Sequence, residues 1–344
     1  MKSTFAISCL VTSVLAAETG AQSKHVGTPQ PNVFQEASTL ALLTPTNKDL
    51  LFEARPALHL YVLNQFGDQY WQKHGQRERG FMKEIASATA ISFLPEIRMS
   101  TDRSSPVRTP SYRIRATQQA VWMKRAPANG AGFRMTGLKL TLFGHYSNGQ
   151  SGCRLRGFAP VATAGADSVC APVDPIVAPQ RLPNFDTGDF STSYFALAFD
   201  QRYGNAGPSG DPLSGLWEWG LEYQVHPIGL QPGGTDQEQA LTYGMHELTS
   251  RYAWERRFAE SRKLAGVFRV SALGTTRFGK DAKPIHRSEL EVSYVFDGLG
   301  AFGFFLRHHA GFDYYNIRYT EKSPFVSFGL RFDPGRLDRV ATDP

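Results

Sequence analysis

The hydrophobic and polar positions of this chain alternate with a period of two through most of its length. In the last such segment, residues 324–333, Val326, Phe328, Leu330 and Phe332 share one parity, and mostly polar or small residues take the other. In a β-strand, successive side chains point to opposite faces. The alternation therefore predicts strands with one apolar face and one polar face.

Eleven segments show this pattern, and Gly, Pro, Asn or Asp residues separate them. They lie near residues 57–65, 83–94, 111–123, 133–147, 191–201, 215–226, 247–258, 263–273, 287–297, 301–315 and 324–333. Single-chain bacterial barrels have an even number of strands. One strand has therefore been missed or counted in excess, and we expect twelve.

Two folds give such an alternation, a soluble β-sandwich and a transmembrane β-barrel. The barrel is favoured by segment length, since a membrane-crossing strand needs about 9 to 11 residues. It is also favoured by aromatic residues near segment ends, namely Trp217, Trp219, Tyr314 and Tyr315. We predict an all-β fold, an antiparallel transmembrane β-barrel of twelve strands in the outer membrane.

The chain divides into a short leader, one barrel and its flanking segments. A basic start and a short apolar run predict a secretory signal peptide over residues 1–21. Residues 22–50 are polar, and we expect a periplasmic arm with little structure. The barrel follows over 51–334, with a tail at 335–344. Residues 148–190 are rich in Gly, Pro and Ala, and we expect a long extracellular loop without strands.

Charge and cysteine content narrow the expected partners. The net charge of +6 is modest, and its Lys and Arg residues are scattered. We therefore expect no nucleic-acid binding, whereas an environment of acidic headgroups or lipopolysaccharide phosphates suits such a charge. Beyond the signal peptide the cysteines are Cys153 and Cys170, and an oxidising compartment favours a disulfide between them.

The candidate chemistry lies at the end of the strand near 133–147. His145 and Ser147 are two residues apart, so a strand directs both side chains to one face, with Cα atoms roughly 6.5 to 7 Å apart. A base beside a hydroxyl is the core of nucleophilic acyl transfer. There is no Gly-x-Ser-x-Gly segment to indicate a nucleophile elbow.

Strict alternation would turn this pair toward the barrel interior. His145 and Ser147 have the parity of Lys139 and Thr141, whereas the leucines of the strand have the other parity. A β-bulge reverses the parity of the residues that follow it, and bulges are common at barrel rims and beside active sites. A bulge near Phe143-Gly144 would therefore turn the pair outward.

The segment His145-Tyr146-Ser147-Asn148-Gly149 resembles the motif of the outer membrane phospholipases A. These are twelve-stranded barrels that hydrolyse acyl esters of membrane phospholipids. The segments 309–316 and 324–333 are also similar to the last two strands of that family. The resemblance implies a phospholipase of A1/A2 type, a carboxylic ester hydrolase. Ser147 would be its nucleophile and His145 its general base, at a rim that faces the outer leaflet. A site that faces lipid requires the bulge near Phe143-Gly144, and we predict it on this ground.

The resemblance also implies a third catalytic residue, calcium and a homodimer. The family orients its histidine with an asparagine, and Ser193 is nearest to that position here, with Asp186 and Asp189 as alternatives. The family binds calcium near the oxyanion site and across a dimer interface. In this chain, Gln150 and Ser151 are the candidate ligands.

Two other functions remain open. Lipid A deacylases are barrels with a similar His-x-Ser-Asn segment, but they are smaller and carry alanine where this chain has Gly149. The barrel could also be a non-catalytic pore or surface protein. His308 and His309 are adjacent and point to opposite faces of a strand, so we expect no shared metal site there.

Overall fold

The computed structural model describes the strands of the chain and the residues beside them. These are residues 37–45, 50–64, 86–100, 111–125, 132–147, 158–161, 169–172, 191–205, 215–230, 240, 244–258, 265–279, 283–296, 302–312, 322 and 324–333. Within these ranges, no helix is long and apolar enough to cross a membrane.

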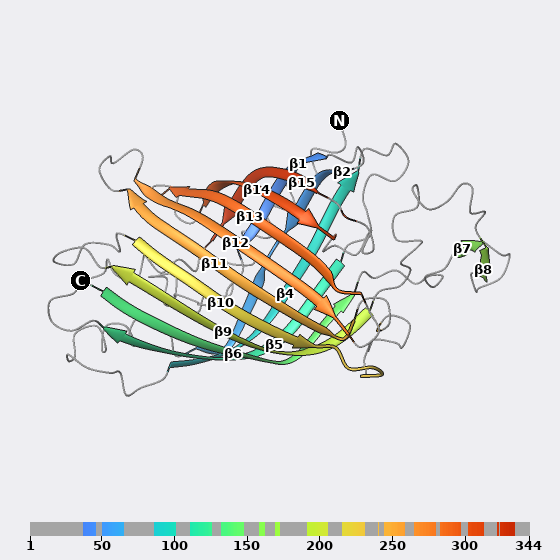
Figure 1. Cartoon of the computed structure of the whole chain (residues 1–344), viewed down its shortest axis with the longest axis horizontal. Coiled ribbons are helices and arrows are strands. Elements are labelled where there is room, and N and C mark those ends of the chain that lie inside the picture. Colours follow the sequence, from blue (N-terminus) through green and yellow to red (C-terminus); the bar gives the residue numbers. More distant parts are fainter. Residues whose placement is uncertain are drawn as a thin grey trace.

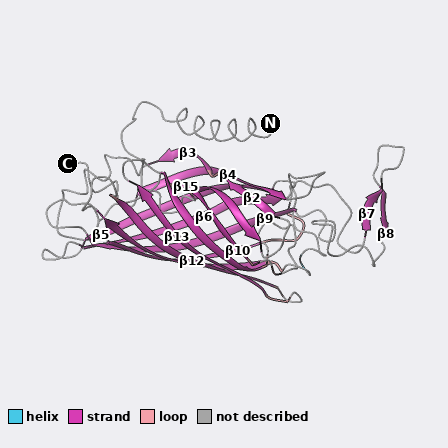
Figure 2. Ribbon diagram, turned by 90° about the horizontal axis from the view of Figure 1, so that it is seen from above, coloured by secondary structure: helices cyan, strands magenta, loops and turns pink. Residues whose placement is uncertain are grey.

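The described residues form one closed antiparallel barrel and a separate small hairpin. The barrel strands are β1 (Ser38–Pro45), β2 (Leu50–Arg55), β3 (Leu58–Asn64), β4 (Ala86–Ser100), β5 (Ser111–Arg125), β6 (Gly132–Ser147), β9 (Ser191–Asn205), β10 (Gly215–Val225), β11 (His246–Phe258), β12 (Gly266–Phe278), β13 (Ile285–Phe296), β14 (Phe302–Gly311) and β15 (Phe325–Phe332). Each strand pairs with its neighbour around the wall, and β1 pairs with β15. The strands tilt across the barrel, as Figures 1 and 2 show.

The barrel closes where β2 and β3 both pair with β4. β2 pairs with the end of β4 and β3 with its first half, so the two share one side of β4 with a break at Pro56-Ala57. Proline has no N–H to donate to a ladder, which suits this break. Counted as one wall strand, β2 and β3 complete a barrel of twelve strands, and the predicted fold class is confirmed.

The wall carries apolar side chains outside and charged side chains inside. Large exposed apolar residues occur along the outer face, for example Trp217 (64% exposed) and Leu306 (51%). Buried inside are charged residues such as Arg98 (0%) and Lys139 (1%). This is the reverse of a soluble core, and it is the arrangement of a transmembrane barrel, whose closed sheet also pairs its backbone groups internally.

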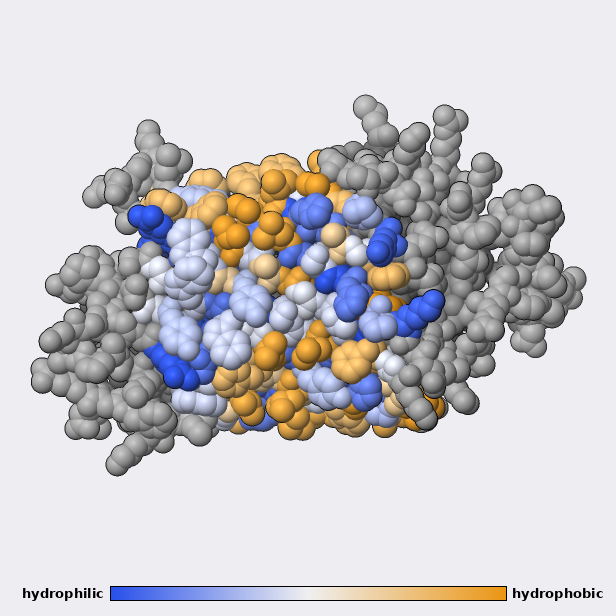
Figure 3. Space-filling model, in the orientation of Figure 1, coloured by the Kyte–Doolittle hydropathy of each residue, from blue (hydrophilic) through white to orange (hydrophobic). Residues whose placement is uncertain are grey.

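The outer surface shows this pattern directly. Apolar residues, orange in Figure 3, form much of the upper and lower parts of the visible wall. Hydrophilic residues lie at both ends of that face, and some lie between the apolar regions. Exposed apolar residues on the outer wall are what the hydrocarbon layer of a bilayer requires.

Ion pairs fill the interior of the barrel. Glu53 lies 2.8 Å from both Arg55 and Arg98, and Lys139 lies 2.8 Å from Glu222. Further around the wall, Arg251 and Asp200 are 2.9 Å apart. Removing a charge from water is costly unless a partner of opposite charge is close, so these groups stabilise one another only as a network.

Two sequence predictions need correction. The missing twelfth strand is β1, which lies within the range 22–50 that was predicted to be a largely unstructured arm. Its short apolar run does not alternate cleanly, and its strand form depends on long-range pairing with β15 and β2. In addition, β7 (Phe158–Val161) and β8 (Val169–Pro172) form a hairpin within 148–190, where no strand was expected. These strands pair only with each other, so short-range ladder bonds form despite the Gly/Pro/Ala-rich composition.

The other domain predictions fall largely outside the described residues. The proposed signal peptide, 1–21, and the tail, 335–344, are not among them. Cys170 lies in β8, whereas Cys153 is outside the described residues, and no disulfide is formed within the described part of the chain. The disulfide between them therefore stays a prediction.

The orientation of the wall can be tested by placing a charge on its outer face. Leu306 lies at the middle of β14 and Phe258 at the end of β11, both outward. In a lipid bilayer, Leu306→Arg should lower the free energy of unfolding by about 2 to 4 kcal/mol, and Phe258→Arg by about 0 to 1 kcal/mol. Denaturant titration of the protein folded into vesicles measures both. Equal, small losses would contradict a lipid-facing wall.

Candidate active site

A β-bulge interrupts β6 close to its end. On one side, Ala116 of β5 pairs with Phe143 and Thr117 pairs with Thr141, so Leu142 has no partner. On the other side, the pairing with β9 shifts between Thr141 and Gly144. The pairing with both neighbouring strands thus shows one extra residue in β6. The bulge predicted near Phe143-Gly144 is confirmed.

The bulge exchanges the two faces of β6. Before it, Lys139 and Thr141 are buried in the interior, and Leu140 is exposed on the outer face. After it, the even-numbered Tyr146 is buried in the interior. The odd-numbered His145 and Ser147 are half-buried and point away from it. The two candidate catalytic side chains therefore lie on the outer face of the wall, on the side of the leucines.

His145 is held by the strand beside it. It is directly opposite Ser193 of β9 in the register, and its Nδ1 is 3.3 Å from Oγ of Ser193. Ser193 is fully buried, so this contact is shielded from water. If the Nδ1–H donates to the serine oxygen, Nε2 carries the lone pair and is the nitrogen that can accept a proton.

Ser147 lies on the same outer face as His145. It is the last residue of β6 and lies between Tyr112 of β5 and Ser191 of β9 in the register. Its position two residues after His145 places both side chains on the same face of an extended strand. The arrangement thus places two hydroxyls and an imidazole on one face of two adjacent strands.

Apolar side chains surround the pair on the outer wall. Ile114 faces His145 across the β5–β6 ladder and is 42% exposed. Phe195 is two residues after Ser193 and is 41% exposed. Tyr112 stacks on Phe93 with ring centroids 6.0 Å apart. The surface around the site is therefore suited to contact hydrocarbon.

Aromatic residues pack behind the site on the interior side. The ring of Tyr194 covers Gly144, and Tyr146 and Tyr194 belong to one buried cluster. Arg113 lies over the Tyr146 ring at 4.8 Å. His226 lies 5.3 Å from Tyr194, between ring centroids. Sequence reasoning missed these supporting residues, although a tyrosine between two outward residues must point inward.

A second contact anchors the start of β9. Nδ1 of His226 is 2.9 Å from Oγ1 of Thr192, and the backbone N–H of His226 donates to the carbonyl of Met245. Thr192 immediately precedes Ser193 and points to the interior. The loop after β10 therefore fixes the backbone that presents Ser193 to His145.

The position of four other predicted site residues is not described. Asp186, Asp189, Gln150 and Ser151 are outside the described residues, so their roles stay predictions. Among the residues that the structure describes, no group of three or more His, Cys, Asp or Glu could hold a metal ion.

The adjacent histidines of β14 separate as predicted. His308 is exposed outside, and His309 is fully buried inside. Nδ1 of His309 lies 3.6 Å from the Glu289 carboxylate. His309 therefore belongs to the interior network and not to the outer surface.

The comparisons with known proteins identify no family for this chain and find distant structural likenesses. No protein-family model matches the chain, and no curated protein matches it either. Among solved structures it is similar to an active-site mutant of outer membrane phospholipase A from Escherichia coli. The sequence identity is 14%, the match covers 91% of this chain and 94% of that chain, and the TM-score is 0.47. The calcium-bound outer membrane phospholipase dimer of Salmonella typhi gives 13% identity, 92% and 96% coverage and a TM-score of 0.45.

A barrel of another kind is also similar. The beta domain of the Bordetella autotransporter BrkA gives 11% identity, 86% coverage of this chain and 97% of that chain, and a TM-score of 0.36. At such identities these likenesses concern the arrangement of strands alone. Any activity of this chain has to be argued from its own residues.

The packing of Tyr194 on Gly144 gives a direct test of the bulge. A Cβ added at Gly144 would lie 2.6 Å from Cε1 of Tyr194, whereas one at Gly215 would meet its nearest atom, the Glu255 carbonyl oxygen, at 3.5 Å. Gly144→Ala should therefore lower the free energy of unfolding by about 1 to 3 kcal/mol, and Gly215→Ala by less than about 0.5 kcal/mol.

The same measurement should show coupling between the two positions. In a double-mutant cycle, Tyr194→Ala should remove most of the cost of Gly144→Ala, because the ring that the new methyl group meets is gone. Additive losses would mean that the ring does not constrain the bulge.

Proposed function

We propose that this protein is an outer-membrane phospholipase that hydrolyses acyl ester bonds by a serine–histidine mechanism. The observation that supports this most strongly is the contact of His145 with Ser193 on the outer face of the wall. Ser147 lies on the same face, two residues after His145. Three residues from two strands thus supply a nucleophile, a base and a group that orients the base. The reaction class is acyl transfer to water.

Each residue has a defined task in this mechanism. Ser193 accepts a hydrogen bond from Nδ1–H of His145 and so leaves Nε2 as the base. Nε2 takes the proton from Oγ of Ser147 as this oxygen attacks the ester carbonyl carbon. The protonated imidazole then gives its proton to the leaving alcohol, and an acyl-enzyme remains. Water, activated by the same imidazole, releases the fatty acid.

The surroundings of the pair support a membrane lipid as substrate. The site opens on the outer wall, where Ile114 and Phe195 are exposed, and not on the charged interior. A phospholipid in the bilayer has its ester bonds at the boundary between headgroups and hydrocarbon, close to the level of a barrel rim. The long connection 148–190 leaves the barrel at this end, and long connections of such barrels are extracellular. The outer leaflet is therefore the proposed source of substrate.

A wide pore is not supported by the interior. Glu53, Arg98 and Lys139 are each 1% exposed or less, so these charged side chains are packed together in the described part of the lumen and do not line an open channel. A lipid A deacylase would use the same chemistry on another acyl ester, and it remains the second candidate. The two enzymes are distinguished by the lipid whose fatty acid is released.

Whether the proposed hydrolase activity depends on calcium is to be measured. A cation beside the ester would polarise its carbonyl. The candidate ligands Gln150 and Ser151 are outside the described residues, and the described ones offer no cluster of acidic or histidine ligands. The mechanism above therefore assigns no step to a metal. Activity with calcium and with a chelator shows whether one is required.

Replacing the nucleophile is the first test. Ser147→Ala should reduce fatty-acid release from phospholipid in mixed micelles by at least about a thousandfold. Ser288→Ala, on the exposed outer face of β13, should leave the rate unchanged. Lipid A is offered in parallel, with and without calcium. Equal activity of the two variants, or release from neither lipid by the native chain, would rule out the proposed phospholipase.

Removing the orienting hydroxyl is the second test. Ser193→Ala should lower kcat roughly five- to tenfold with little change in KM, because one neutral hydrogen bond is worth about 1 kcal/mol. Ser250→Ala is the matched control, because its Oγ donates to the Gly274 carbonyl on β12. A larger KM with unchanged kcat would show that Ser193 positions the substrate instead of the imidazole.

A further inference from the structure

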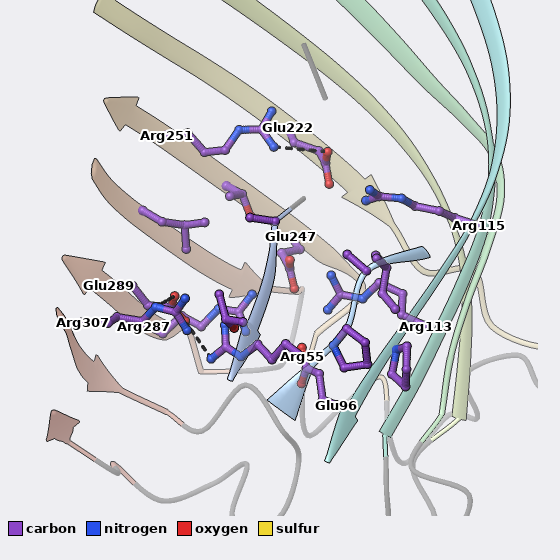
Figure 4. A pocket seen from close by; sticks show the side chains of 18 of the residues that line it. Arg55, Glu96, Arg113, Arg115, Glu222, Glu247, Arg251, Arg287, Glu289 and Arg307 are labelled. Atoms are coloured by element: carbon purple, nitrogen blue, oxygen red, sulfur yellow. Dashed lines mark ion pairs between the residues drawn. The ribbon is translucent and has the colours of Figure 1, made fainter. Parts of the chain in front are cut away.

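A cavity of about 240 Å³ lies in the barrel interior. Its size corresponds to several water molecules and is smaller than a typical pocket for a drug-sized ligand. Figure 4 shows arginine and glutamate side chains around it, from β5 on one wall and from β13 and β14 on the opposite wall. The charges that line it are Arg55, Arg113, Arg115, Arg251, Arg287, Arg307, Glu96, Glu222, Glu247 and Glu289.

The lining has an excess of positive charge. It contains six arginines and four glutamates. Both signs of charge also have partners beyond the lining. Glu222 lies 2.8 Å from Lys139 and Glu247 lies 3.7 Å from Arg277, while Arg251 lies 2.9 Å from Asp200 and Arg307 lies 2.7 Å from Glu291. Glu289 is shared between Arg55 at 3.7 Å and Arg307 at 3.8 Å. The cavity is therefore a place where an anion is attracted.

The arginines of β5 give this charge a geometry. Arg113 and Arg115 are two residues apart and point into the barrel from one strand, with Arg115 only 4% exposed. Arg287 and Arg55 face them across the cavity in Figure 4. A guanidinium presents paired N–H groups that match the oxygens of phosphate, and a phosphate group carries about 1.5 to 2 negative charges near pH 7. That charge equals the excess of the lining.

We propose that this cavity binds a small molecule bearing a phosphate group, held between Arg113 and Arg115 of β5 and Arg287 of β13. The site is separate from His145 and Ser147, which lie on the other face of the wall. Phosphate binding in this cavity does not depend on the proposed hydrolase activity.

Calorimetric titration of the folded full chain in detergent tests the site. Inorganic phosphate is the first probe and glycerol phosphate the second, with ionic strength held constant by chloride. We expect saturable binding of one equivalent. Arg115→Gln should weaken it about tenfold, because a charge-assisted hydrogen bond is lost. The control Arg134→Gln, which removes an exposed arginine over the Tyr203 ring, should leave it unchanged.

A variant with the opposite expected effect guards against simple damage to the fold. Glu96 lines the cavity beside Arg113, so Glu96→Gln removes a competing negative charge and should tighten phosphate binding several-fold. Loss of binding in both Arg115→Gln and Glu96→Gln would overturn the site, as would the absence of saturable binding by either probe. Tighter binding of glycerol phosphate than of inorganic phosphate would identify a headgroup fragment as the source, and the reverse would identify the free ion.

Discussion

The hydrocarbon of a bilayer allows only apolar side chains on the outside of a barrel and forces charged ones inside. Because strand side chains alternate, this constraint fixes the direction of each residue in the wall. Trp217 and Leu306 are exposed, and Arg98 and Glu53 are buried, for this one reason. The interior charges in turn require one another, so the ion pairs that fill the lumen are a consequence of the wall and not an independent source of stability.

The proposed site depends on the place where the alternation is broken. Without the extra residue at Leu142, His145 and Ser147 would join Lys139 among the interior charges. With it, they reach the outer face, and Tyr146 takes the inward position. The ring of Tyr194 over Gly144 and the contact of Ser193 with His145 both lie at this point, so one irregularity links the packing behind the wall to the chemistry in front of it.

Much of this could be predicted from the sequence, because alternation and strand length are local properties. The barrel class follows from parity, whereas the bulge and the position of Ser193 beside His145 were predicted with the help of the motif at residues 145–149, which resembles that of a family whose site faces lipid. β1 could not be recognised, because its strand form depends on pairing with β15 at the far end of the chain. The hairpin β7–β8 could not be recognised, because the Gly/Pro/Ala-rich composition of 148–190 disfavours strands and the two short strands are held by pairing with each other. The support from Thr192 and His226 was also missed, because residues distant in sequence meet only after the barrel closes.

The central claim is that Ser147 is a nucleophile presented to the membrane. It is tested most directly by a serine-directed phosphonate that carries a long alkyl chain and is delivered in phospholipid vesicles to the folded protein. Peptide mapping by mass spectrometry then locates the covalent adduct. The account predicts one adduct on Ser147, which His145→Ala abolishes. A protein that remains unlabelled, or an adduct on another serine that persists without His145, would contradict it.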